Sequence, residues 1–153
     1  MRKIGADISA EEHKTSKKLV ASTDSLECVS KTIDTLFRTG ARHILLRGEL
    51  ASGKTTLVRS YALFRGISAP ITSPTFSLLH SYARDFHHYD LYNRDLEELL
   101  ALGLLEMLQE EGIHLIEWGD ERLENLLKRV GFPTGIVTIL PHKQGRLYRI
   151  THA

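Results

Sequence analysis

The stretch "RGELASGKTT", residues 47–56, separates two glycines by four residues and follows the second one with lysine and threonine. This spacing matches the pattern G-x-x-x-x-G-K-[ST] of phosphate-binding loops. The apolar run 43–46 before it predicts a short buried strand, and apolar residues at helical spacing after it predict a helix closed by Gly66. Because phosphate binding requires a loop between a strand and a helix, the stretch predicts a P-loop.

Each residue type in this loop has a physical role toward a nucleotide. Consecutive backbone N–H groups wrap phosphate oxygens, and the positive end of the following helix adds to the attraction. Glycines permit the turn and the close approach of the backbone, the lysine reaches the β and γ phosphates, and the threonine is a ligand for Mg²⁺. The predicted nucleotide-binding residues of the loop are Gly48, Glu49, Leu50, Ala51, Ser52, Gly53, Lys54, Thr55 and Thr56.

Length and composition limit the classes of protein to consider. The chain has 153 residues, a net charge of +1 and 42% hydrophobic residues, which favours one domain with a real core and no strong nucleic-acid footprint. A lone cysteine, Cys28, fits a reducing compartment, and no apolar run reaches the length of a membrane span. We therefore expect a cytoplasmic protein without a signal peptide or a membrane contact.

The remaining pattern predicts an α/β fold. Residues 1–17 read as an N-terminal extension or a loose first element, and residues 18–153 as a single P-loop ATPase domain. The predicted strands are 18–22, 43–46, 76–82, 86–92, 113–118, 136–140 and 147–150. Apolar spacing predicts helices around 26–37, 57–62, 95–102, 104–111 and 123–130. Residues 22–24 are cap candidates for the first helix, and Asp95 with Glu98 forms a predicted capping box.

Two acids are candidates for the metal and for catalysis. Glu117 ends the buried strand "IHLI", where an acid can hold a metal-bound water or act as a base. Asp90 alternates with apolar neighbours in "HHYDLYN", and His88 shares its strand face and is expected to orient it. His87 and His88 point to opposite faces of a strand, so they do not share a metal and zinc is not expected.

A stiff turn, Ser73–Pro74–Thr75, carries two hydroxyl groups between the loop helix and the predicted hairpin. Such a turn has the chemistry of a switch segment that contacts the γ phosphate. The spacing alone leaves this reading and that of a simple loop open. No Asn-Lys-x-Asp motif for reading guanine is present, so GTP is not favoured.

Four stretches taken together resemble the TsaE family of P-loop ATPases, which act in the synthesis of threonylcarbamoyladenosine on bacterial tRNA. They are "GELASGKT" (48–55), "SPTF" (73–76), "HYDLY" (88–92) and "IEW" (116–118), in the order and spacing of the family motifs G-D-L-G-A-G-K-T, S-P-T-F, H-x-D-x-Y-R and I-E-W. The resemblance covers residues 23–118 and, more weakly, the C-terminal hairpin.

The resemblance implies a mostly parallel P-loop NTPase-type sheet with flanking helices and added antiparallel hairpin strands. It implies ATP and Mg²⁺ as cofactors, metal ligation by Thr55, Glu117 and Asp90, and catalytic roles for Asp90, Glu117 and the switch residue Thr75. Trp118 is expected at the edge of the nucleotide. The implied partners are the TsaB and TsaD proteins, whose complex modifies adenosine 37 of tRNAs reading ANN codons. The ATP cycle of TsaE regulates or resets that complex, and tRNA is reached through it.

Two residues depart from the family pattern. Ala51 replaces a glycine within the loop, which is tolerated unless that backbone needs positive φ. Asn93 replaces an arginine after Tyr92, and Arg94 would point the other way if the strand continues.

Two other functions remain open from the residues alone. A small-molecule P-loop kinase needs arginines in a lid, for which Arg122 and Arg129 are candidates. A non-catalytic, nucleotide-dependent binding module is left open because Asn93 stands where the family has an arginine. For the ATPase, the sequence predicts weak hydrolysis by the chain alone, because no arginine is placed over the γ phosphate.

Overall fold

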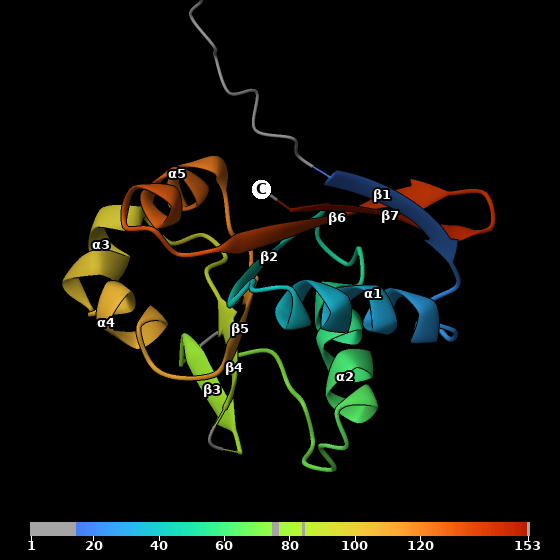
Figure 1. Ribbon diagram of the computed structural model, residues 1–153, viewed down its shortest axis with the longest axis horizontal. Helices are drawn as coiled ribbons and strands as arrows, with labels where there is room; N and C mark the ends of the chain where they lie inside the picture. The colour runs from blue at the N-terminus through green and yellow to red at the C-terminus, as the bar shows by residue number, and fades with distance from the viewer. Residues whose placement is uncertain (1–14, 75–76, 84, 153) are drawn as a thin grey trace, which may run out of the picture.

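The computed structural model describes residues 15–74, 77–83 and 85–152, which form one seven-stranded sheet with its helices (Figure 1). The strand order is β1-β7-β6-β2-β5-β4-β3. Strands β6, β2, β5 and β4 run parallel at the centre, whereas β1, β7 and β3 add antiparallel edges. The strands are β1 (Thr15–Ala21), β2 (His43–Arg47), β3 (Leu79–Tyr82), β4 (Phe86–Asp90), β5 (Ile113–Glu117), β6 (Thr134–His142) and β7 (Gly145–His152).

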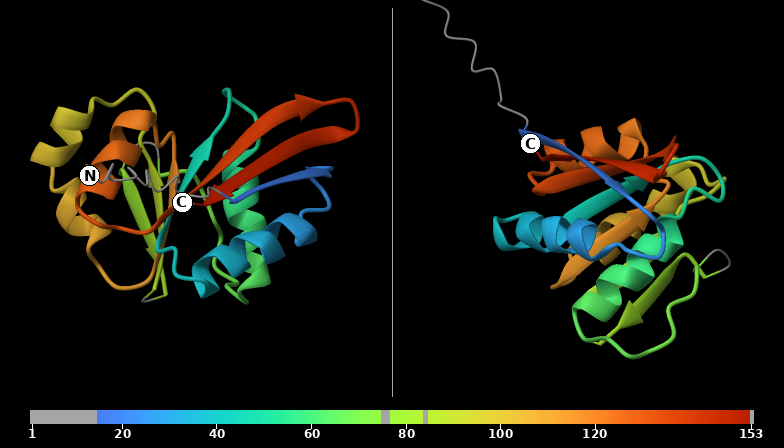
Figure 2. Two further views of the ribbon diagram at one scale, coloured as in Figure 1. Left: turned by 45° about the horizontal axis from the view of Figure 1, so that its top comes forward. Right: turned by 90° about the vertical axis from the view of Figure 1, so that its right-hand side faces the viewer.

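Helices cover both faces of the sheet (Figure 2). On one face, α1 (Glu27–Arg38) and α2 (Lys54–Phe64) pack over a core that includes Ile33, Leu57 and Val137. On the other face lie α3 (Leu96–Ala101), α4 (Leu104–Leu108) and α5 (Glu121–Arg129), over a second core around Leu45 and Ile116. Burial on both faces explains why the central strands are apolar runs rather than alternating patterns. Within the described ranges, none of the helices has the length and apolar character needed to cross a bilayer.

The predicted fold class is confirmed, and several element boundaries differ. The first strand begins earlier than predicted, at Thr15, because its backbone pairs with β7 over its whole length. The C-terminal hairpin is also longer, with β6 and β7 paired from Gly135↔His152 to His142↔Gly145. At these edges, backbone pairing extends the strands beyond the apolar positions that sequence patterns detect. The strand predicted over 86–92 is instead shorter, because β4 ends at Asp90.

Two predicted helix caps are wrong. The residue before α1 is Leu26, which makes no side-chain cap, and the Ser22 hydroxyl instead accepts from the Asp24 N–H at 3.3 Å. Asp95 does precede α3, but its carboxylate makes no cap and lies 3.4 Å from Arg122 Nη1.

Three histidines form a row across the parallel strands at the end of the sheet opposite the phosphate loop. His43, His114 and His87 are register neighbours on β2, β5 and β4, and their rings stack at centroid distances of 4.6 and 4.7 Å. Each Nε2 donates to a backbone carbonyl at or just after the end of α4, at distances of 2.7 to 2.9 Å. The row therefore satisfies carbonyl groups that a helix C-terminus leaves unpaired.

Acid should weaken this fold through the histidine row. Burial lowers the pKa of His43 to about 4 and that of His114 to about 3, below the ordinary value near 6.5. Between the lowered and the ordinary pKa the unfolded chain binds more protons than the folded chain, so the unfolding free energy falls as the pH drops. We expect a slope of up to about 1.4 kcal/mol per pH unit for each histidine.

Chemical denaturation at a series of pH values measures this slope. His114→Gln should flatten it between pH values of about 6.5 and 4, whereas the matched change His142→Gln, at an exposed end of the hairpin, should leave it unchanged. An equal slope in wild type and His114→Gln would contradict the prediction.

Candidate nucleotide site

The phosphate loop runs from the end of β2 to the start of α2, and its two glycines are required for different reasons. A Cβ at Gly48 would lie 2.5 Å from Ser52 Oγ and 3.0 Å from the carbonyl oxygen of Ile139, so a side chain has no room there. Gly53, the residue before α2, has a φ of 104°, which side chains disfavour. The loop conformation thus explains both glycines of the motif.

Ala51 occupies a position that favours glycine. Its φ is 61°, in the left-handed region, where an alanine is strained by about 1–2 kcal/mol. The departure from the family pattern at this residue therefore has a structural cost. Asn93, the other departure, has a φ of 53°, which asparagine tolerates better than most residues.

We expect Ala51→Gly to raise the unfolding free energy by about 0.5–1 kcal/mol, since the strain removed exceeds the added entropy of the unfolded chain. Urea denaturation of the purified variant measures the change. The matched variant Ala101→Gly, at the exposed last residue of α3, should lower it by up to about 1 kcal/mol. Destabilisation by Ala51→Gly would show that the left-handed backbone is not a source of strain.

Lys54 folds back over the loop. Its Nζ donates to the carbonyl oxygens of Gly48 at 2.8 Å and Glu49 at 2.9 Å, and lies 3.9 Å from the centre of the Trp118 ring. Only 5% of the residue is exposed. Burial lowers the pKa of Lys54, while the nearby carboxylate of Glu117 acts in the opposite direction. An ammonium held at the head of a helix is suited to receiving phosphate.

Thr55 is joined to Glu117 by a hydrogen bond. Thr55 Oγ1 lies 2.9 and 3.0 Å from the two carboxylate oxygens of Glu117, which is 3% exposed at the end of β5. His88 Nε2 lies 2.6 Å from Glu117 Oε2, and because a carboxylate only accepts, Nε2 carries the proton. The prediction that His88 orients Asp90 is wrong, since the register sets His88 diagonally from Glu117 on the same face.

Asp90 lies directly opposite Glu117 in the parallel register of β4 and β5. Its Oδ2 accepts from the Ser73 hydroxyl at 2.7 Å, and its Oδ1 accepts from the backbone N–H of Tyr92 at 2.9 Å. β4 ends at Asp90 and the chain turns, so the strand does not continue to Arg94. The ends of two adjacent parallel strands thus present two carboxylates beside the loop.

A cleft of about 530 Å³ joins these groups, which is within the usual range for ligand sites. It is lined by Leu50, Ala51, Ser52, Gly53, Lys54, Thr55, Thr56, Ser73, Asp90, Tyr92, Glu117 and Trp118. Gly48 and Glu49 adjoin it through their contacts with Lys54. Thr75, the predicted switch residue, lies outside the described residues.

The oxygen atoms that side chains bring to the cleft are suited to magnesium that is bound together with a phosphate ligand. Magnesium takes oxygen ligands, commonly one or two carboxylates together with substrate phosphates and water. Thr55, Glu117 and Asp90 bring one hydroxyl and two carboxylates to the cleft. Among the described residues, no group of three His, Cys, Asp or Glu side chains is arranged to hold a metal by itself. The chemistry of the cleft therefore suits a metal that arrives with its nucleotide.

Two features of the site lie beyond what the sequence indicates. Trp118 has a φ of 64°, a conformation costly for a bulky residue and typical of functional sites. The centre of its ring lies 4.9 Å from that of Tyr92, which is 44% exposed at the cleft. No local pattern signals a left-handed tryptophan, and the pairing of the two rings depends on the meeting of β4 and β5.

Comparison with known proteins identifies relatives over most of the chain. The sequence model of the family described as "Threonylcarbamoyl adenosine biosynthesis protein TsaE" matches residues 11–145. A tRNA threonylcarbamoyladenosine biosynthesis protein TsaE from Treponema pallidum is 41% identical over 80 residues, which are 50% of this chain and 59% of the relative. The proteins of the same name from Bacillus subtilis and Mycobacterium bovis are 33% and 32% identical, over 58% and 72% of this chain.

The chain spans less than two thirds of these curated relatives, with 62% of the Bacillus subtilis protein and 66% of the Mycobacterium bovis protein covered. Among solved structures, the crystal structure of Bacillus subtilis YdiB matches with a TM-score of 0.59 and 21% identity. The match covers 91% of this chain and 85% of YdiB. At this identity the likeness establishes the shared fold.

Proposed function

Since this chain belongs to the TsaE family, we propose that it binds and hydrolyses ATP in the threonylcarbamoyladenosine modification of tRNA, where it regulates or resets a complex of the TsaB and TsaD proteins. The family is one of P-loop nucleotide-binding proteins named for this biosynthesis. The observation that carries the proposal is the hydrogen bond from Thr55 to Glu117 at a lysine-bearing phosphate loop.

The charged residues of the cleft and the Thr55 hydroxyl have distinct roles in this proposal. Lys54 and the loop N–H groups bind and orient the β and γ phosphates of ATP. Magnesium, when bound, supplies positive charge that offsets the charge of the phosphate oxygens. Thr55, Glu117 and Asp90 are its proposed ligands, and one of the two carboxylates also holds the attacking water and accepts its proton. His88 keeps the Glu117 carboxylate in place beside the loop.

A partner is needed for fast turnover in this mechanism. Lys54 is the only Lys or Arg among the described residues that line the cleft. An arginine that reaches the γ phosphate in the transition state increases turnover by about 10³–10⁵ in other P-loop hydrolases. The isolated chain is therefore expected to hydrolyse ATP slowly and to be stimulated by TsaB and TsaD.

Reconstitution tests the proposal. The chain is added to purified TsaB and TsaD with tRNA, threonine, bicarbonate and ATP, and modified tRNA is counted per complex. We expect modification to continue beyond one round only when the chain is present, and ATP turnover to rise when both partners are added. Multiple rounds without the chain would contradict the regulatory role, and unchanged turnover would contradict the stimulation.

The alternative of a small-molecule kinase has less support. Arg122, a candidate for a lid arginine, pairs with the carboxylates of Asp95 and Glu97 and does not line the cleft. Formation of a phosphorylated product from ATP and any of a panel of small acceptor molecules would support the kinase alternative. A nucleotide-dependent binding module without hydrolysis would show ATP binding and no turnover with the partners present.

A further inference from the structure

The short link between β5 and α5 places Trp118 at the cleft. Residues 118–120 join the end of β5 at Glu117 to the start of α5. At the far end of the link, the carboxylate of Asp120 caps α5. The centre of the Trp118 ring lies 3.9 Å from Lys54 Nζ. The conformation of this link therefore sets where the ring meets the phosphate loop.

The backbone of Trp118 requires restraint by its surroundings. Its φ of 64° lies in the left-handed region, which a bulky residue disfavours. Such a conformation persists only where neighbouring structure holds it. The Trp118 N–H donates to the carbonyl oxygen of Leu46 at 2.9 Å, and this bond holds the residue on its N-terminal side. A second restraint is needed on the C-terminal side.

Arg47 supplies that second restraint. It is the last residue of β2 and directly precedes Gly48, the first glycine of the phosphate loop. Its Nε donates to the carbonyl oxygen of Gly119 at 2.6 Å. Gly119 packs so closely on β2 that a Cβ built on it would lie 2.7 Å from Leu45 Cδ2. Trp118 thus lies between two backbone groups that are both bonded to the end of β2.

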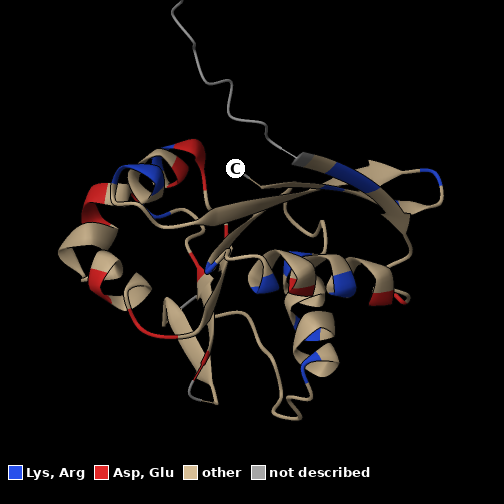
Figure 3. Cartoon of the chain, viewed as in Figure 1, with Lys and Arg blue, Asp and Glu red and all other residues tan. Residues whose placement is uncertain are grey.

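A buried acid of α5 fixes the orientation of Arg47. The Nη2 atom of Arg47 lies 2.9 Å from Glu124 Oε2, and the Glu124 side chain is only 10% exposed. Figure 3 shows charged residues of both signs on α5, and those other than Glu124 are exposed: Glu121, Arg122, Lys128 and Arg129. Because the donors of a guanidinium lie in one plane, the bonds to Glu124 and to Gly119 together determine how Arg47 lies.

Arg47 acts on the cleft from outside it. It is not among the described residues that line the cleft. It lies two residues after Leu45, which belongs to the core under α5, so its side chain is on the face of the sheet opposite the loop helix α2. Any effect of Arg47 on a bound nucleotide must therefore pass through the link 118–120.

We propose that Arg47 is a positioning residue of the nucleotide site, which together with Glu124 holds the link 118–120 so that the Trp118 ring stays against Lys54. The ring and the ammonium are then in place before a nucleotide arrives. The proposal rests on the proposed function, because it takes ATP as the ligand and its hydrolysis as the reaction.

Loss of this restraint should change the KM for ATP and spare kcat. A site that adopts its binding arrangement only part of the time binds with an affinity reduced by that fraction. Once ATP is bound, the phosphates hold Lys54 themselves, so the chemical step no longer depends on the ring. A direct role of Arg47 in the chemistry would instead lower kcat.

The fluorescence of Trp118, the only tryptophan of the chain, and the kinetics of ATP hydrolysis test the proposal. In the free chain, Arg47→Met should make Trp118 emit at longer wavelength and be quenched more strongly by acrylamide. With TsaB and TsaD present, the KM for ATP should rise about tenfold if the competent fraction falls to about one tenth, with kcat near wild type. Arg47→Lys keeps the charge beside Glu124 but lacks the planar set of donors, so it should show the same pattern.

Arg38→Met is the matched control. Arg38 also pairs through its Nε with a mostly buried acid, Asp34, at 2.7 Å, but it lies on α1. This variant should keep the fluorescence and the KM of wild type, and changes equal to those of Arg47→Met would point to a general loss of stability and overturn the proposal. Wild-type quenching or a wild-type KM in Arg47→Met would overturn it as well, and Arg47→Lys provides the same test if Arg47→Met does not fold.

A failure of the proposed function would look different. A wild-type chain that neither binds nor hydrolyses ATP would overturn that function. The fluorescence of the free chain needs no nucleotide, so it would still show whether Arg47 holds Trp118 in place.

Discussion

Lys54→Ala is expected to weaken the binding of ATP by about 2–5 kcal/mol, the range found when one partner of a buried charge pair is removed. The ammonium is buried, and its present partners are neutral carbonyl oxygens of the loop together with the face of Trp118. Phosphate oxygens carry full charge and form stronger hydrogen bonds with an ammonium than carbonyls do. Without the lysine, only loop N–H groups and the helix end remain to attract the triphosphate.

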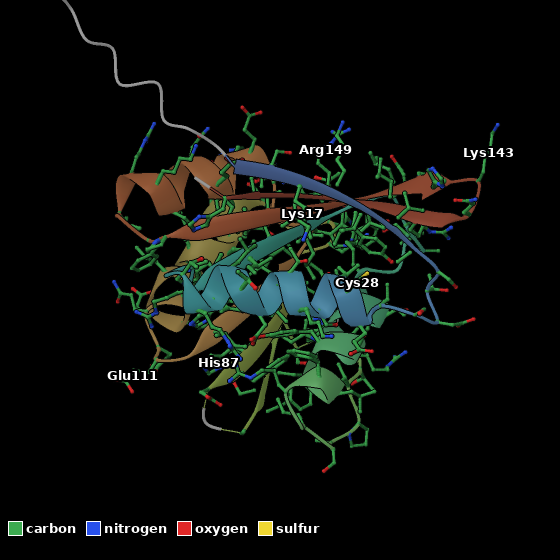
Figure 4. All side chains as sticks on the ribbon, turned by 45° about the vertical axis from the view of Figure 1, so that its right-hand side comes forward. Lys17, Cys28, His87, Glu111, Lys143 and Arg149 are labelled. Carbon is green, nitrogen blue, oxygen red and sulfur yellow. The ribbon has the colours of Figure 1, made fainter. Side chains whose placement is uncertain are left out.

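Trp118 offers a direct measurement of this loss, because it is the only tryptophan of the chain and lies against Lys54. Titration with ATP should change its fluorescence as the ammonium moves from the ring to the phosphates. Lys143→Ala, at the exposed tip of the hairpin (Figure 4), is the matched control and should titrate as wild type. ATP binding by Lys54→Ala at wild-type strength, measured by calorimetry, would refute the assignment of the loop.

The parts of the fold that the sequence predicts well are those with a local signal. The phosphate loop has a fixed spacing of glycine, lysine and threonine, and the strand and helix on either side have their own apolar periods. The hairpin of β6 and β7 is signalled by two apolar runs around Gly145. The parallel centre of the sheet follows because a P-loop fold joins strands through helices.

The parts that escape prediction depend on contacts between distant segments. The sequence pattern predicts that His88 orients Asp90, which lies two residues along the same strand. In the structure, the register of β4 with β5 brings His88 within hydrogen-bond distance of Glu117 instead. Arg146 shows no motif, and its contact with Ser52 depends on how far β6 runs past the end of β2. Register and strand length are properties of the assembled sheet, so no local pattern contains them.

The second large effect is expected from the two carboxylates at the ends of β4 and β5. Glu117→Gln and Asp90→Asn each remove a negative charge and keep the shape of the side chain. The glutamine oxygen can still accept from Thr55 and His88, so the loop should keep its structure. Hydrolysis stimulated by the partners should nevertheless fall by about 10²–10⁴, the usual contribution of a general base.

ATP binding separates this loss from a structural defect. Because the proposed function assigns the phosphates to Lys54 and the loop N–H groups, both variants should bind ATP and unfold at temperatures close to that of wild type. Glu98→Gln, on the exposed side of α3, is the matched control and should keep full turnover. If Glu117→Gln turned over ATP at the wild-type rate, the carboxylate at the end of β5 would have no part in the chemistry. If Glu117→Gln lost ATP binding as well as hydrolysis, the role of Glu117 would be to shape the loop through its hydrogen bond with Thr55.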